Sequence, residues 1–298
     1  MTALKRLALL LLVAAAPPAR AGEGSSTVTI TLTQAAHGGG RVYVPVRFGN
    51  VMGAMRLDTG ASTSRIKLAP WNKDLPILGQ SDSTGALGKV TRCEDVQATN
   101  VALKAEQGNN IARAKYDVTR CAASDGDDLL GLDFFKGARF TLDFERREMV
   151  FFGPQMDGRP VLFQPLGPDQ RLVGISIRAG TAKSLGLFDT GAEISAVDQQ
   201  FVERHRGLFA PVESKFKASE ASGGGAVSRI YKIKTLDLGD GRVLRNVHAL
   251  VYDFGALREA LGPQTAFVLG VNILSRFNWA LDFTKPTQAS WIARPRKP

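Results

Sequence analysis

Two aspartates in this chain lie in matching short segments, half a chain apart. The segments are Leu57-Asp58-Thr59-Gly60-Ala61 and Phe188-Asp189-Thr190-Gly191-Ala192. Two carboxyl groups brought together by an internal two-fold cannot both ionise easily, so one keeps a proton that the other has lost. Such a pair can act as general base and general acid on one water. The alternative for either segment alone is an ordinary turn, since aspartate and glycine both favour turns.

The segments on either side of the aspartates also repeat. An apolar, partly alternating segment ending in a glycine turn precedes each one, at residues 42–50 and 172–180. An apolar-apolar-Gly segment follows each, at Gly131 and Gly270, and then come Arg-Phe and Leu-Asp-Phe. The alternation predicts strands joined in hairpins, and Pro45 within the first strand favours an edge position. The simplest account is that the chain contains two copies of one ancestral unit.

Short apolar segments and glycine turns dominate both units, which predicts an all-β fold of two lobes. We expect an N-terminal lobe at residues 22–152, a proline-rich linker at 153–168 and a C-terminal lobe at 169–298. Each unit is near the usual size of a single-core domain. Helix is expected only in short pieces, near residues 198–205 and 253–261.

Residues 1–21 have the pattern of a secretory signal, with a basic start, a short apolar stretch and an Ala-x-Ala cleavage site. The apolar stretch is too short to span a bilayer, and no other stretch approaches that length. We therefore expect an exported protein, periplasmic or secreted, without a membrane span. The formal net charge is +10, but the basic residues are scattered without interleaved aromatics, so nucleic acid is not an expected partner.

The chain has two cysteines, Cys93 and Cys121. In an oxidising compartment a disulfide between them is the default expectation. A catalytic thiol is the poorer alternative, because no histidine lies in a recognisable partner motif. The histidines show no metal-ligand spacing, and the acidic residues at 125–128 are interpreted as a solvated loop rather than a calcium site. Neither a metal nor a cofactor is expected.

The paired Asp-Thr-Gly-Ala segments, each followed by an apolar-apolar-Gly segment, resemble the aspartic proteases, and more closely the retropepsin-like branch. The resemblance covers nearly all of the mature chain. It implies two similar closed β-barrel lobes related by a pseudo-two-fold, with the active-site cleft between them. Retropepsins are usually homodimers that give one aspartate each, whereas this chain supplies both. A monomer with an intrachain pair is therefore expected, and a dimer with swapped pairs is the alternative.

The resemblance also implies roles for individual residues. The catalytic pair would be Asp58 and Asp189, and glycine-tipped hairpins would cover the substrate. Thr59 and Thr190 would lock the two loops across the pseudo-two-fold, Gly60 and Gly191 would permit the tight turns, and the covering hairpins would carry Gly85 and Gly88 in one lobe and Gly223 and Gly224 in the other.

The function implied is that of an exported aspartic endopeptidase, which hydrolyses a peptide or protein with a water activated between the two aspartates. The alternative is a non-catalytic two-lobed protein of the same fold that binds peptides or acts as a scaffold. Ala61 and Ala192 cannot donate the hydrogen bond that a serine or threonine there gives to the ionised acid. We therefore expect the pair to keep its proton to higher pH and to work in the weakly acidic range.

Overall fold

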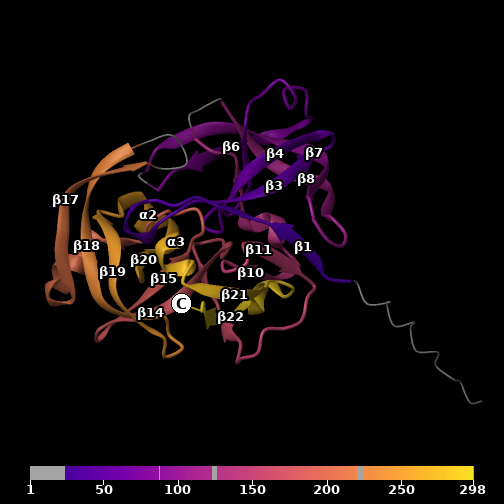
Figure 1. Ribbon diagram of the computed structural model, residues 1–298. Coiled ribbons are helices and arrows are strands. Elements are labelled where there is room, and N and C mark those ends of the chain that lie inside the picture. The colour runs from indigo at the N-terminus through magenta and orange to yellow at the C-terminus, as the bar shows by residue number, and fades with distance from the viewer. Residues whose placement is uncertain (1–23, 87, 123–125, 220–224, 298) are drawn as a thin grey trace, which may run out of the picture.

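The computed structural model describes residues 24–86, 88–122, 126–219 and 225–297. The expected signal segment at 1–21 and the expected hairpin glycines Gly223 and Gly224 lie outside these ranges. Within these ranges, no helix combines the length and the apolar character that a membrane crossing requires. Strands dominate the described chain and form one sheet for each lobe and a third sheet that both lobes share (Figure 1). The expected all-β, two-lobed fold is confirmed.

The N-terminal lobe is built on an eight-stranded sheet of order β2-β3-β4-β9-β5-β8-β7-β6. A second pairing, of β3 with β7, curls this sheet toward closure. Side chains of β3 alternate between buried and half-buried, as its apolar alternation predicts. The strands are β2 (Thr31–Leu32), β3 (Val42–Phe48), β4 (Val51–Leu57), β5 (Arg65–Lys67), β6 (Ile77–Thr84), β7 (Val90–Leu103), β8 (Ile111–Cys121) and β9 (Leu129–Leu130).

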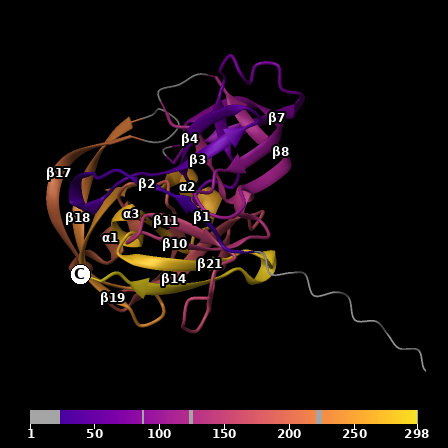
Figure 2. The ribbon, with the colours of Figure 1, turned by 45° about the vertical axis from the view of Figure 1, so that its right-hand side comes forward.

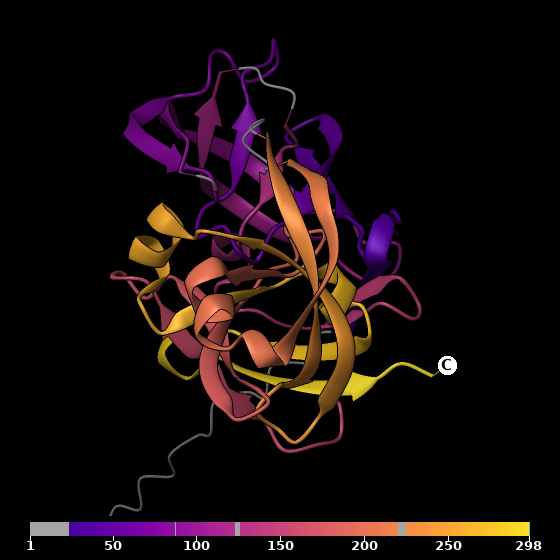
Figure 3. The ribbon, with the colours of Figure 1, turned by 90° about the vertical axis from the view of Figure 1, so that its left-hand side faces the viewer.

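The C-terminal lobe repeats this sheet strand for strand, in the order β13-β14-β15-β20-β16-β19-β18-β17. The pairing of β14 with β18 repeats that of β3 with β7. Figure 3 shows the long hairpin of β17 and β18 rising toward the N-terminal lobe. The strands are β13 (Gln164–Leu166), β14 (Leu172–Ala179), β15 (Ala182–Phe188), β16 (Ala196–Asp198), β17 (Phe209–Ser219), β18 (Gly225–Asp237), β19 (Val243–Tyr252) and β20 (Thr265–Leu269).

A six-stranded sheet of order β1-β11-β10-β21-β22-β12 joins the lobes (Figures 1 and 2). Its central pair, β10 and β21, consists of the Leu-Asp-Phe strands that end the two repeats, and they run antiparallel. Trp279 is fully buried here, with its ring 5.0 Å from that of Phe188 in the C-terminal lobe. The strands are β1 (Ser26–Thr29), β10 (Arg139–Asp143), β11 (Glu148–Phe151), β12 (Val161–Leu162), β21 (Phe277–Asp282) and β22 (Ser290–Pro295).

The expected linker is itself partly stranded. Within residues 153–168, β12 pairs with β22 of the shared sheet, and β13 pairs with β14 of the C-terminal lobe. Residues that cross between the lobes are therefore anchored by main-chain hydrogen bonds at two places.

The helices are short. The described ones are α1 (Gln199–Arg204), α2 (Gly255–Leu261), α3 (Val271–Leu274) and the 3₁₀ turns η1 (Ala36–Gly38), η2 (Leu132–Phe135), η3 (Arg206–Leu208) and η4 (Pro286–Gln288). Asp198 caps α1 by accepting the N–H of Gln200, and it also accepts hydrogen bonds from Arg258 on α2. These contacts fix α1 and α2 to each other at one side of the C-terminal lobe.

Pro45 does not mark an edge strand, because β3 lies inside its sheet between β2 and β4. The proline is accommodated because β3 changes partners at this point. The strand β2 pairs only with Val42 and Tyr43, and β7 pairs only with residues 46–48. The missing N–H of Pro45 therefore falls between two short runs of pairing.

A disulfide joins Cys93 on β7 to Cys121 on β8. The two residues are 28 positions apart in sequence, so the bond restricts a sizeable loop of the unfolded chain.

Replacing both cysteines by serine should lower the free energy of unfolding by about 3 kcal/mol, because the unfolded chain regains the loop freedom that the bond removes. The measurement is urea unfolding followed by tryptophan fluorescence. Reductant should shift the midpoint of the wild type toward that of the variant and leave the variant unchanged. Equal midpoints for all four samples would contradict the prediction.

Candidate functional site

Each repeated aspartate follows the last residue of a central strand, Asp58 after β4 and Asp189 after β15. Their main-chain N–H groups donate equivalent hydrogen bonds, to the carbonyl of Leu130 at 2.9 Å and to that of Leu269 at 3.1 Å. The carboxyl groups meet at the interface of the lobes and hydrogen-bond to each other. The two aspartates therefore form a pair within one chain.

The threonines that follow the aspartates hold the two loops together by crossed hydrogen bonds. Thr59 Oγ1 donates to the carbonyl of Phe188 at 2.8 Å, and Thr190 Oγ1 donates to that of Leu57 at 2.9 Å. Each hydroxyl also accepts the main-chain N–H of the opposite threonine, at 3.1 and 3.0 Å. Both threonines are fully buried. This symmetric set ties the backbone on both sides of the pair.

Gly60 and Gly191 pack directly against the opposite carboxyl groups. A Cβ on Gly60 would collide with the carboxyl of Asp189, and one on Gly191 would collide with that of Asp58. Their N–H groups donate to the aspartate of their own loop, at 3.1 Å to Asp58 Oδ1 and at 2.7 Å to Asp189 Oδ1. Any larger residue at these positions would push the acids apart.

The surroundings of the pair favour a shared proton. Burial raises the pKa of Asp58 and that of Asp189, and the nearby charge of Asp58 adds to the rise at Asp189, whose pKa lies at about 8. The guanidinium of Arg56 opposes the rise at both acids. Two carboxyls in contact titrate as one coupled unit, so near neutral pH the pair holds one proton and carries one negative charge.

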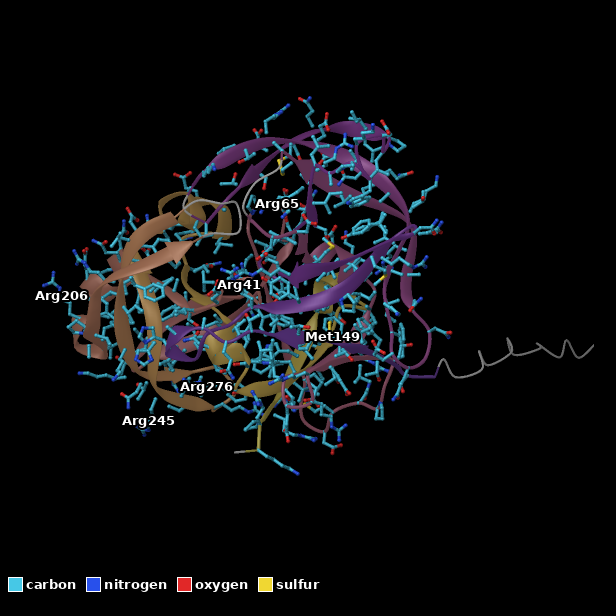
Figure 4. The ribbon with its side chains drawn as sticks, turned by 45° about the horizontal axis from the view of Figure 1, so that its top comes forward. Arg41, Arg65, Met149, Arg206, Arg245 and Arg276 are labelled. Atoms are coloured by element: carbon cyan, nitrogen blue, oxygen red, sulfur yellow. A yellow bond between two sulfur atoms is a disulfide. The ribbon has the colours of Figure 1, made fainter. Side chains whose placement is uncertain are left out.

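Arg56 is a buried cation that the sequence did not single out, although it lies two residues before Asp58. Its Nη2 donates to the carbonyl of Gly191 at 2.6 Å, and its Nη1 lies 3.4 Å from Asp127. Glu193 lies 3.8 Å from Arg56 and pairs at 2.5 Å with Arg41. These four side chains, Arg41, Arg56, Asp127 and Glu193, form one ionic cluster beside the pair. Figure 4 places Arg41 near the middle of the molecule, between the lobes.

The acidic segment at 125–128 is therefore not simply a solvated loop. Asp127 belongs to the ionic cluster and accepts a hydrogen bond from Tyr43 at 3.2 Å, and Asp128 accepts the N–H of Lys67 at 2.8 Å. Asp125 lies outside the described residues. Among the residues that the structure describes, no group of three or more His, Cys, Asp or Glu side chains could hold a metal ion.

Two equivalent serines, Ser64 and Ser195, connect the chain after each aspartate loop to the later glycine of the same lobe. Ser64 Oγ accepts the N–H of Gly131 at 2.8 Å, and Ser195 Oγ accepts that of Gly270 at 2.9 Å. A Cβ on Gly131 would collide with the backbone at residues 63–64, and one on Gly270 with that at residues 192–195. The serines lie at equal distances after the two aspartates. That spacing was available in the sequence as a signal for them.

The pair lines a cavity of about 710 Å³ between the lobes, which is within the range of ligand-binding clefts. The tip of the β6–β7 hairpin lies over it, with Gly85 and Ala86 in the lining. The turn is closed by a 2.9 Å hydrogen bond from the N–H of Gly88 to the carbonyl of Gly85, and Gly88 has the positive φ of 83° that suits glycine. A Cβ on Gly88 would lie 3.4 Å from Ala256 on α2 of the opposite lobe.

The C-terminal lobe contributes its own hairpin, β17–β18, to the cavity. Phe216 and Ser228 from this hairpin line the space. The first hairpin thus reaches across the cavity to the C-terminal lobe, and the second closes another side of it.

The chain resembles known proteins in sequence over one lobe and in fold over its whole length. Residues 175–273 match the family model described as aspartyl protease. No curated protein matches the chain. Among solved structures, the aspartic proteinase from Irpex lacteus shares the fold with a TM-score of 0.52 at 15% identity, covering 91% of this chain and 97% of that one. The lobe that matches the aspartyl protease family model is repeated strand for strand by the N-terminal lobe, and the two lobes together have the fold of a two-lobed aspartic proteinase.

Proposed function

We propose that this protein is an exported aspartic endopeptidase whose catalytic pair is Asp58 and Asp189. The observation that carries the proposal is the direct contact of the carboxyl groups of the buried Asp58 and the half-buried Asp189 on the wall of a cavity between two lobes. A buried pair of acids is costly to maintain, and a protein that merely bound peptides would have no use for it. The contact within one chain favours a monomer over a dimer with swapped pairs.

The reaction follows from the protonation state of the pair. The ionised carboxylate takes a proton from a water as the water oxygen attacks the carbonyl carbon of the peptide bond. The protonated acid hydrogen-bonds to the carbonyl oxygen and stabilises the tetrahedral intermediate. The proton taken from the water then passes to the amide nitrogen, and the C–N bond breaks. The products are a carboxyl and an amine, and the pair again holds one proton.

The remaining site residues would keep this geometry. Thr59 and Thr190 would hold the loops in register, and Gly60 and Gly191 would let the acids meet. Gly85 and Gly88 would place the hairpin backbone over an extended peptide. Gly223 and Gly224 would do so from the second lobe, where the structure does not describe them.

Export is proposed from the N-terminal signal pattern together with the disulfide. A disulfide between Cys93 and Cys121 suits the periplasm or the exterior, where thiols become oxidised. Comparing the N-terminal residue of the protein recovered from a secreting host with the expected cleavage after Ala21 tests this.

Replacing either aspartate by asparagine should reduce peptide cleavage by at least about a thousandfold, because the pair acts as a unit. The measurement is digestion of a mixture of denatured proteins, read by mass spectrometry of the new termini. Asp74→Asn is a matched control, because this carboxylate is exposed, and it should cleave like the wild type. Full activity in Asp58→Asn or Asp189→Asn would remove that residue from the catalytic pair. Absence of cleavage by the wild type would favour the binding-protein alternative.

Activity should depend on pH as a bell with its maximum in the weakly acidic range. The pair must carry one proton, and the higher pKa, that of Asp189, lies at about 8. As the pH rises through that value the shared proton is lost and cleavage should fall. The measurement is kcat/KM for one fluorogenic peptide from pH 3 to 9. An optimum in strongly acidic solution, with no activity left at pH 6, would contradict the assignment.

The proton shared by the pair should also make the free energy of unfolding depend on pH when no substrate is present. The pKa of Asp189 is raised in the folded protein, so its contribution to stability is complete below about pH 4 and is lost as the pH rises to about 8. Asp189→Asn has no such loss. The difference in unfolding free energy between the variant and the wild type should therefore grow in the variant's favour, by about 1–3 kcal/mol, from pH 4 to pH 8. Urea unfolding at both pH values measures it, and a pH-independent difference would contradict it.

A further inference from the structure

The internal repeat allows the two halves of the cavity to be compared position by position. Arg56 and Leu187 each lie two residues before an aspartate of the pair. The strand registers confirm that they are equivalent, because Arg56 lies opposite Leu129 and Leu187 lies opposite Val268 in parallel pairings. All four residues line the cavity. Residues at equal spacings therefore occupy equivalent places on either side of the acids.

The equivalent positions differ in chemistry throughout the ionic cluster. Each member of the cluster lies at the same spacing, from an aspartate of the pair or from the later glycine, as an uncharged residue of the other unit. The four matched pairs are Arg41 with Leu172, Arg56 with Leu187, Asp127 with Ala266, and Glu193 with Ser62. One side of the aspartate pair is thus flanked by charged side chains, and the other by small or apolar ones.

The other side of the acids presents apolar side chains to the cavity. Leu172, Leu187 and Val268 line the cavity there, together with Leu257 and Leu261 from α2. Leu187, Leu261 and Val268 are buried in one hydrophobic cluster, against which the half-buried Leu172 and Leu257 pack. A side chain that covered the half-buried leucines would remove further apolar surface from water.

The charged side favours a different side chain. Arg56 is 5% exposed, and its buried Nε has no hydrogen-bond partner among the residues that the structure describes. The side chains of Arg41 and Glu193 remain 36% and 27% exposed. A large apolar side chain placed over them would remove their water without replacing its hydrogen bonds, which is costly. A side chain with an acceptor oxygen could instead bond to the partly exposed guanidinium of Arg41.

The difference in chemistry between the two sides of the cavity extends to a further pair of positions in each lobe. Arg65 and Thr119, which pair between β5 and β8, stand where Ala196 and Leu250 pair between β16 and β19. All four line the cavity. Figure 4 shows Arg65 above Arg41, on the side of the N-terminal lobe that faces the other lobe.

We propose that the enzyme selects peptides with a large apolar side chain on one side of the cleaved bond and a glutamate or glutamine on the other. The apolar side chain would lie against Leu172, Leu187 and Val268, and the polar one against Arg41 and Arg56. This selectivity rests on the proposed function, because the aspartate pair would define which peptide bond is cleaved and therefore which side chains lie on either side of it.

The test uses four octapeptides that differ only in the two central residues: Phe-Glu, Glu-Phe, Phe-Phe and Glu-Glu. In one series the central amide is reduced to CH₂–NH, so that the peptide sits at the aspartate pair without being cleaved. One of the two mixed peptides should bind the wild type at least about tenfold more tightly than Phe-Phe and Glu-Glu, measured by calorimetry. Binding of Phe-Phe as tight as that of the better mixed peptide overturns the proposal, and so does absence of binding by all four.

A variant that exchanges residues between the two sides sharpens the test. Arg41→Leu with Glu193→Ser removes one ion pair as a unit and installs the residues of the apolar side. It should reduce the preference for the mixed peptide over Phe-Phe by about tenfold. Lys73→Leu with Asp74→Ser, an exposed pair outside the cavity lining, should leave the preference unchanged. Equal preferences in all three proteins would overturn the role of the ionic cluster.

The same peptides with ordinary amide bonds separate this proposal from the proposed function. Cleavage of a mixed peptide by the wild type supports the function. Selective binding of the reduced peptides without cleavage of the ordinary ones would leave the subsites standing and overturn the endopeptidase. Cleavage of Phe-Phe and of the mixed peptides at equal rates would support the endopeptidase and overturn the proposed selectivity.

Discussion

The contact between the carboxyl groups of Asp58 and Asp189 at the interface of the lobes is the interaction on which this structure depends. Like charges in a site of low dielectric repel strongly, so the pair is stable only with a shared proton or with compensating donors. The protein supplies both. The N–H groups of Gly60 and Gly191 stabilise the ionised form, and Arg56 adds a positive charge. The backbone must then keep the acids from relaxing apart.

The crossed hydrogen bonds of Thr59 and Thr190 meet that requirement locally, and the shared sheet meets it globally. The hydroxyls tie each loop to the strand that carries the opposite acid. Below them, β10 and β21 continue one sheet across the boundary between the lobes, so that a relative shift of the lobes would break a ladder of main-chain hydrogen bonds. The buried rings of Phe140 and Phe283, whose centroids lie 6.1 Å apart, pack across the same boundary.

The two-fold symmetry is kept in the contacts that hold the backbone of the aspartate loops and is lost among the side chains that face the cavity. The threonines, the glycines and the serines at 64 and 195 make matching contacts in both units. The ionic cluster has no counterpart, because its matched positions carry Leu172, Leu187, Ala266 and Ser62. One chain that carries both units can change each side of the cleft separately, whereas a homodimer must change both.

The sequence by itself determined the strands, the repeat and the equivalence of Asp58 and Asp189, because apolar alternation and turn residues act over short distances. It did not reveal that β3 is interior despite Pro45, since a change of pairing partner is set by strands far along the chain. Nor did it single out the ionic cluster. Arg41 and Glu193 are 152 residues apart, and only the docking of the lobes brings them together. Contacts of that kind depend on tertiary packing, which local patterns do not encode.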